Sequence, residues 1–114
     1  MPADCLFCRM ASGEIAVPKV HEDDLVFAIR DINPQAPTHA LVMPVAHVAS
    51  AAQLSEADAP TLARLFSVAA AIAKQDGLDG GWRVVTNVGP DGGQTVQHLH
   101  LHLLGGRQMH WPPG

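Results

Sequence analysis

The 114-residue sequence contains no tyrosine, only two cysteines and no long apolar run. No stretch approaches the roughly 18 consecutive apolar residues that indicate a membrane-spanning helix. The N-terminal sequence MPADCLFCRM has no charged segment followed by an apolar one, so no secretory signal peptide is expected. We therefore expect a cytoplasmic protein without a membrane partner, in which the cysteines remain thiols or bind metal.

Basic residues are also scarce, with seven lysines and arginines against eleven acidic residues and a net charge of −4. Because no Lys/Arg cluster is present, we do not expect a polynucleotide to bind through its phosphates. The low positive charge does not exclude a single nucleotide bound by neutral hydrogen-bond donors. The length predicts one domain over residues 1–114, with enough apolar residues to bury a core.

What the sequence does contain is histidine at alternate positions. Three histidines alternate with three leucines in the stretch VQHLHLHLLG, residues 96–105: His98, Leu99, His100, Leu101, His102 and Leu103. Alternation is the period of a β-strand, so the histidines are expected on one face and the leucines on the core face. The outer histidines would lie about 13 Å apart along the strand, too far for one ion to bind all three. A catalytic row and a merely exposed polar face remain the alternatives.

Hydrophobic periodicity predicts an α+β domain with an antiparallel sheet of about five strands, one main helix and a short N-terminal helix. The short helix is expected at residues 5–12. Strands are expected at 24–32, 38–44, 82–89 and 96–104, with a further short strand around Val20. Apolar residues spaced by three and four between Leu62 and Ala73 predict the main helix. Asp58 or Ser55 is expected to cap its start, and Gly77 to end it.

The stretch GPDGGQ, residues 89–94, predicts a glycine loop that leads into the histidine strand. Backbone N–H groups in such a loop can bind phosphate, although PDGG also forms ordinary hairpin turns. Imidazole is a good nucleophile toward phosphorus at neutral pH because its pKa lies near 6.5. Together these features indicate phosphoryl or nucleotidyl transfer through a phospho-histidine bond.

The motif HLHLHLL and the segments DINPQAPTHALVMP and NVGPDGGQTVQHLHLHLLGGRQMHWPPG resemble the Hint branch of the histidine-triad (HIT) superfamily. The resemblance covers about residues 5–114 and implies the HIT-like fold, a homodimer and no required cofactor. It implies hydrolysis of purine nucleoside 5′-phosphoramidates, such as adenosine 5′-phosphoramidate, and of aminoacyl adenylates through a covalent nucleotidyl-histidine intermediate. The alternatives are a dinucleoside polyphosphate hydrolase, which the WPPG tail disfavours, and a zinc-stabilised HIT binding module with little catalysis.

The resemblance also assigns roles to individual histidines. It implies that His100 is the nucleophile, that His102 contacts the phosphate and helps the leaving group, and that His39 partners His98 in a proton relay. Transferases of the superfamily carry glutamine in place of His102. A histidine can supply a proton to the departing amine, which a glutamine cannot, so this residue favours hydrolysis.

Further residues are implied to bind the nucleotide. Asp31 matches the acid that binds the ribose hydroxyls. The others are expected around the phosphate or the apolar base: Asn87, Gly93, Gln94 and Thr95 for the phosphate, and Leu6, Phe7 and Ile32 for the base. Thr95 stands where the family usually has serine, and its hydroxyl is expected to make the same hydrogen bond.

Cys5 and Cys8 form a Cys-x-x-Cys motif, which is half a zinc site. The resemblance to some bacterial relatives implies that His47 and His98 complete a structural zinc site. A pair of free thiols is the alternative, and the choice stays open because His98 is also assigned to the relay.

The C-terminal tail, residues 105–114, is expected at the dimer interface. Gly105 and Gly106 let the chain turn away, and Trp111 is a large aromatic that cannot be buried in a core of the tail's own. The resemblance implies that Trp111 contacts the amine portion of the substrate in the partner's site. A disordered tail with an exposed Trp111 is the alternative.

Overall fold

The computed structural model describes residues 4–114 and contains a five-stranded antiparallel sheet. The main elements in chain order are α1 (Leu6–Ala11), β1 (His21–Glu22), β2 (Val26–Arg30), β3 (Thr38–Pro44), α2 (Ala59–Gln75), β4 (Trp82–Val85), α3 (Gly89–Gly92) and β5 (Leu101–Gly105). The strand order is β1-β2-β3-β5-β4, so the last strand of the chain lies between β3 and β4. The predicted α+β class, the strand number and both predicted helices are confirmed.

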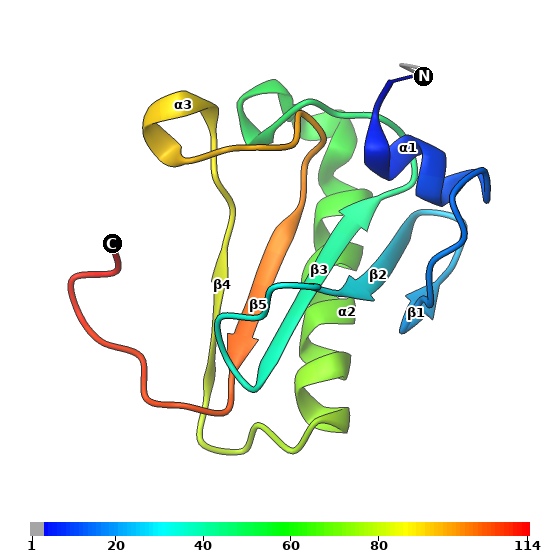
Figure 1. Ribbon diagram of the computed structural model, residues 1–114. Coiled ribbons are helices and arrows are strands. Elements are labelled where there is room, and N and C mark those ends of the chain that lie inside the picture. The colour runs from blue at the N-terminus through cyan, green and yellow to red at the C-terminus, as the bar shows by residue number, and fades with distance from the viewer. Residues whose placement is uncertain (1–3) are drawn as a thin grey trace.

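Helices lie on both faces of the sheet. Figure 1 shows α2 running along one face behind the strands, while α1 lies near the ends of β2 and β3. Alternate residues of each strand therefore enter two separate cores. The α2 side buries Leu65, Ile72, Leu99, Leu101 and Leu103, and the α1 side buries Phe7, Phe27, Leu41 and Met43. Because both faces are covered, β3 is buried along its whole length.

The residues at the two ends of α2 explain where this helix begins and ends. Ser55 N–H donates to Asp58 Oδ2 at 2.9 Å, so the two predicted caps act together around a short 3₁₀ turn that precedes α2. At the other end, Gly77 adopts φ +72° and Leu78 N–H donates to Ala73 O at 2.9 Å, which satisfies a terminal carbonyl. Neither α2 nor any other helix within residues 4–114 is long and apolar enough to cross a membrane.

Two predicted elements need correction. The predicted glycine loop contains one helical turn, α3, which is followed by Gly93 at φ +83°. The histidine strand is also shorter than predicted, because β5 begins only at Leu101. Its neighbour β4 ends at Val85, opposite His102, and Leu99 N–H donates instead to Val48 O in the loop after β3 at 2.6 Å. His98 and His100 therefore lie in the segment before β5, and only His102 lies within the strand.

Candidate active site and metal centre

Four imidazoles gather on the face of the sheet that α2 does not cover. The register of β3 and β5 pairs Leu41 with His102 and His39 with Leu104, so His39 and His102 are diagonal neighbours. The ring centroid of His102 lies 4.9 Å from that of His100 and 5.2 Å from that of His39. Phe7 of α1 places its ring edge-on at 5.2 Å from His100, so α1 closes one side of the histidine row.

His100 is buried, and a main-chain carbonyl selects the tautomer of its neutral ring. Its Nδ1 lies 2.7 Å from the carbonyl oxygen of His98. Because a carbonyl only accepts hydrogen bonds, the proton of the neutral ring is on Nδ1 and the lone pair is on Nε2. A neutral imidazole with a free lone pair is the form that can attack phosphorus.

The partner of His39 is His102. The two rings meet through His39 Nε2 and His102 Nδ1 at 2.9 Å. The expected pairing of His39 with His98 is wrong, because β3 places His39 beside β5 whereas the His98 ring contacts the two cysteines. Burial lowers the pKa of His102 to about 4, with further lowering from His100 and His39 and an opposing effect of Asp31. His102 is therefore neutral at pH 7.

A cavity of about 220 Å³ opens beside this pair of rings. It is lined by Gln35, His39, Val85, Asn87, His102 and Leu104. Asp31 lies close by, with Oδ2 3.4 Å from His39 Nε2 and Oδ1 accepting from Asn33 N–H at 2.8 Å. The structure thus brings Asp31, Asn87 and the two histidines together. A larger hollow of about 480 Å³ at the far end of β4 is lined by none of these residues.

Other residues predicted to bind the nucleotide lie elsewhere. The Gln94 side chain is engaged by main-chain groups of two loops, since Oε1 accepts from Gly89 N–H at 3.0 Å and Nε2 donates to Ala49 O, in the loop after β3, at 2.8 Å. Leu6 and Thr95 line a separate cavity of about 370 Å³ beside Cys5. Two apolar side chains are open to solvent: Ile32 is fully exposed and Trp111 is 82% exposed.

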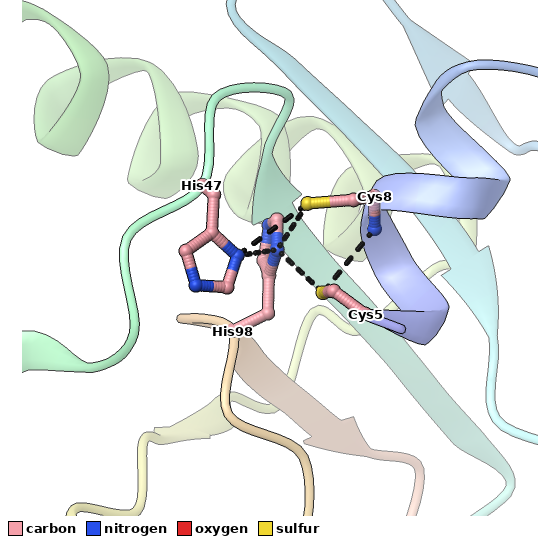
Figure 2. Close-up of side chains that lie close together, drawn as sticks. All are labelled: Cys5, Cys8, His47 and His98. Atoms are coloured by element: carbon pink, nitrogen blue, oxygen red, sulfur yellow. Dashed lines mark hydrogen bonds between the residues drawn. The ribbon is translucent and has the colours of Figure 1, made fainter. Parts of the chain in front are cut away.

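A second cluster joins Cys5, Cys8, His47 and His98, as Figure 2 shows. His98 Nδ1 lies 3.3 Å from Cys5 Sγ and 3.5 Å from Cys8 Sγ, and His47 Nδ1 lies 3.4 Å from Cys8 Sγ. The two histidine Nδ1 atoms are 3.2 Å apart. A tetrahedral zinc ion with ordinary bond lengths separates sulfur from nitrogen by about 3.5 Å and nitrogen from nitrogen by about 3.3 Å. The four side chains therefore fit a tetrahedral zinc ion.

The orientation of His98 agrees with this fit. Its Nε2 lies 2.8 Å from the Pro44 carbonyl oxygen, so Nε2 carries the proton and the Nδ1 lone pair faces the thiols. Burial raises the pKa of Cys8 to about 11, and the neighbouring Cys5 adds to the effect. A bound cation would offset the cost of deprotonating this buried thiol, because a thiol that coordinates zinc is deprotonated.

Three main-chain groups that the sequence analysis missed set these orientations. They are the carbonyl oxygens of Pro44 and His98 and the N–H of Gln35, which donates to His39 Nδ1 at 3.0 Å. Every non-proline residue carries both of these groups, so no sequence signal singles them out. Only the fold shows which of them meets a ring.

This fold and this histidine row define the chain as a member of the HIT domain family, whose profile matches residues 12–109. A HIT family hydrolase from Legionella pneumophila Philadelphia 1 has a similar crystal structure, with a TM-score of 0.94 and 50% identity over 97% of this chain and all of that chain. The 14 kDa zinc-binding protein of Zea mays is 50% identical over 111 residues, 96% of this chain and 87% of its own length. Adenylylsulfatase HINT1 of Arabidopsis thaliana is 46% identical over 111 residues, 96% of this chain and 76% of its own length.

Proposed function

We propose that the protein is a Hint-branch enzyme that hydrolyses purine nucleoside 5′-phosphoramidates and related aminoacyl adenylates. The observation that carries the proposal is the His100 ring, whose Nδ1 is hydrogen-bonded to a carbonyl 2.7 Å away and whose Nε2 lone pair is free. The neutral His102 ring lies next to it, with centroids 4.9 Å apart. A nucleophile beside a neutral hydrogen-bond donor is suited to displacement at a phosphorus atom.

The reaction proceeds in two displacements at the α-phosphorus. In the first, the His100 Nε2 lone pair forms a bond to phosphorus, and the bond to the leaving group breaks with its electron pair going to the leaving atom. An amine nitrogen also takes up a proton from solvent, which the second step returns, whereas the carboxylate of an acyl adenylate leaves with the pair alone. In the second, water attacks phosphorus, the pair of the N–P bond returns to Nε2, and one water proton is released to solvent.

We assign the nucleoside to the cavity beside His39 and His102. The Asp31 carboxylate is placed to accept hydrogen bonds from ribose hydroxyls, and Asn87 lines the same cavity for contact with the phosphate. Phe7 abuts His100, and we expect it to form the apolar base pocket together with Ile32 and with Leu6, which also borders the separate cavity beside Cys5. Leu6 and Ile32 are exposed in this chain, so a bound base has apolar surface to cover there.

Adenylyl sulfate is a further candidate substrate, because one relative carries the name adenylylsulfatase. It presents the same kind of α-phosphorus, with sulfate as the leaving group instead of an amine or a carboxylate. The same attack by His100 would release AMP and sulfate, so this compound belongs in the substrate panel.

The experiment is a panel of adenosine 5′-phosphoramidate, an aminoacyl adenylate and adenylyl sulfate, assayed for AMP release. We expect His100→Ala to lower kcat by at least about a thousandfold because a covalent nucleophile is lost. His21→Ala is the matched control, since His21 lies on β1 and contacts Asp23 instead of the site. Turnover of none of these compounds by the wild-type protein would refute the proposed hydrolase.

We also propose that Cys5, Cys8, His47 and His98 hold a structural zinc ion, which would tie α1 to the two segments that carry the histidines. The interatomic distances support this proposal, as does the relative called a zinc-binding protein. Zinc would supply structural cross-linking and stabilise the thiolates. Elemental analysis of protein purified without a polyhistidine tag should give one zinc per chain in the wild type and none in Cys5→Ser. Zinc-free wild-type protein with full activity and stability would exclude the site.

A further inference from the structure

We propose that the cluster of Cys5, Cys8, His47 and His98 positions the nucleophile of this protein. With zinc bound, the cluster holds the main-chain carbonyl of His98, and this carbonyl orients the His100 ring. His98 is thus a positioning residue that acts through His100. The inference rests on the proposed hydrolase activity and on the proposed zinc site, and it goes beyond both because it makes the nucleophile depend on the metal.

The segment that carries the nucleophile is supported from outside the sheet. Residues 98–100 precede the first residue of β5, so they lie outside the paired residues that join β5 to β3 and β4. Instead, Leu99 N–H donates to Val48 O at 2.6 Å, and Val48 directly follows His47 in the chain. The position of the segment therefore depends on the His98 side chain and on the loop that carries His47, which are both parts of the cluster.

Without a cation, three groups of the cluster compete for one lone pair. The Nδ1 lone pair of the buried His98 ring faces three neighbouring atoms: Cys5 Sγ at 3.3 Å, Cys8 Sγ at 3.5 Å and His47 Nδ1 at 3.2 Å. A single lone pair accepts one good hydrogen bond, so these groups cannot all be satisfied by it. Four ligand atoms that converge on a zinc ion are all satisfied at once. Metal binding therefore selects one position of the His98 ring and, with it, one position of the attached carbonyl.

Helix α1 gives the cluster a second connection to the nucleophile. Figure 2 shows Cys5 and Cys8 projecting from the start of α1 toward the His98 ring. Phe7 lies between the two cysteines in the sequence, and its ring is edge-on to both His98 and His100, with centroid distances of 5.8 and 5.2 Å. Because Phe7 is buried, its position follows that of α1. A metal ion that holds α1 through the two cysteines therefore also holds the aromatic ring against which His100 packs.

The cluster can be reached without passing through the cavity assigned to the nucleotide. Cys5, His47 and Thr95 line the cavity of about 370 Å³, whereas the cavity of about 220 Å³ beside His39 and His102 is lined by other residues. Zinc can therefore enter or leave, and a chelator can act, while a nucleotide is bound. We expect a chelator to lower kcat without competing with the substrate.

The first test observes the nucleophile directly and does not depend on activity. In nitrogen-15 spectra of histidine-labelled, zinc-loaded protein, the His100 Nδ1–H should appear as a slowly exchanging proton, because it is buried and hydrogen-bonded to the His98 carbonyl. After a chelator removes the zinc, this signal should be lost and amide exchange at Leu99 should quicken, whereas Leu65 in α2 stays protected. Added zinc should restore the signal. Zinc-free protein that keeps the His100 signal at full intensity would overturn the proposal.

The second test separates the effect of the metal from that of the His47 imidazole. His47→Ala removes one ligand and should weaken zinc binding by at least about a hundredfold. His47→Cys offers a thiolate instead, which is an ordinary zinc ligand, so this variant should bind zinc and show the His100 signal. At a zinc concentration that just loads the wild type, we expect kcat to fall about tenfold or more in His47→Ala and to stay within about threefold in His47→Cys. If His47→Cys carries zinc but matches His47→Ala in both signal and kcat, the proposal fails.

The third test uses the reciprocity of coupled equilibria, and it decides the matter even if the zinc-free chain unfolds. If zinc favours the conformation in which His100 binds the His98 carbonyl, loss of that hydrogen bond must weaken zinc binding. We expect His100→Ala to raise the dissociation constant for zinc, measured by competition with a chelator, by at least about fivefold. The matched control His102→Ala removes the neighbouring ring, 4.9 Å from His100, and should leave the constant within about twofold.

The zinc measurements also separate this proposal from the proposed hydrolase activity. Equal zinc affinities of the wild type and His100→Ala would contradict the coupling, whatever the activity of the wild type. If none of the adenosine compounds is hydrolysed while zinc affinity still depends on His100, the proposed hydrolase fails and the coupling between the cluster and the His100 ring stands.

Discussion

Three imidazoles of these sites, His39, His98 and His100, take their chemistry from the main-chain group that one of their nitrogens meets. The Pro44 carbonyl turns the lone pair of His98 toward two thiols, and the His98 carbonyl leaves the lone pair of His100 free. The Gln35 amide acts in the opposite sense, because it donates to His39. One type of side chain can thus serve as metal ligand, nucleophile and hydrogen-bond donor within a single row.

The protonation of His102 yields a prediction at this scale. Burial holds its pKa at about 4, whereas an unfolded histidine titrates near 6.5. We expect a proton NMR titration of the assigned ring to give a midpoint well below 5, roughly two units under the ordinary value. Since the unfolded chain binds the proton first, the contribution of His102 to stability is complete above pH 6.5 and declines as the pH falls toward 4. A midpoint at the ordinary histidine value would contradict a buried, uncharged His102.

At the scale of elements, an ion pair ties the end of α2 to the sheet. Arg30 of β2 binds both carboxylate oxygens of Asp76, at 2.6 and 2.9 Å, and Thr38 Oγ1 of β3 donates to the same carboxylate at 2.8 Å. The Arg30 guanidinium lowers the pKa of Asp76, burial opposes this, and Thr38 adds to the lowering. Asp76 follows the last helical residue, so this contact fixes how α2 lies on the sheet.

We expect Asp76→Asn to lower the free energy of unfolding at pH 7 by about 1–2 kcal/mol, because a hydrogen-bonded charge pair is lost. The folded-state pKa is depressed, so the stabilisation is present above the unfolded pKa of about 3.9 and is lost as the pH falls through the folded value. The difference between variant and wild type should therefore shrink in urea titrations as the pH falls below the unfolded value of about 3.9. Asp79→Asn, at an exposed position beyond the helix, is the control and should change little.

Helix α1 provides a second prediction at this scale. It has six residues, too few to be stable alone, and it is held by the burial of Phe7 and by the contacts of Cys5 and Cys8. With zinc bound, a chelator should lower the melting temperature of the wild type and speed amide exchange in α1. In Cys5→Ser the chelator should change neither. An identical response of both proteins to the chelator would show that metal does not hold α1.

The elements were predictable to different degrees for physical reasons. The main helix and the core-facing leucines could be predicted because burial of one face imposes a period on the sequence. The period is three and four residues in α2 and two residues in the histidine segment, and Leu99, Leu101 and Leu103 are indeed buried against α2. The start of β5 was not visible, because it depends on where β4 ends and on the bond from Leu99 to Val48. The separation of His98 from the other triad rings had the same origin, since it depends on distant cysteines and on Pro44.

At the scale of the whole molecule, the C-terminal tail is a candidate contact surface for a second copy of the chain. Residues 106–114 have no core of their own, and Trp111 is 82% exposed. The tail is nevertheless held against the body, because Arg83 donates to His110 O and Arg107 donates to Gln35 O, each at 3.0 Å. Figure 1 shows it leaving β5 and running outside the edge strand β4. An exposed tryptophan on an anchored arm is typical of an interface residue.

We therefore expect a homodimer in which the partner's tail completes each site. Light scattering at micromolar concentration should give twice the chain mass. Truncation after Gly106 should change KM and the selectivity among leaving amines, while turnover of adenosine 5′-phosphoramidate itself is less affected. A monomeric wild type, or a truncated protein with unaltered amine selectivity, would rule out this role for the tail.

The covalent role of His100 is tested most directly by trapping its intermediate. A single turnover of adenosine 5′-phosphoramidate should be quenched in base, where phospho-histidine survives, and the peptides analysed by mass spectrometry. The account predicts one adenylyl group on the peptide that contains His100, located on that ring, and none in His100→Ala. Rapid turnover without an adduct, or His100→Ala protein that retains more than about a tenth of the wild-type kcat, would contradict it.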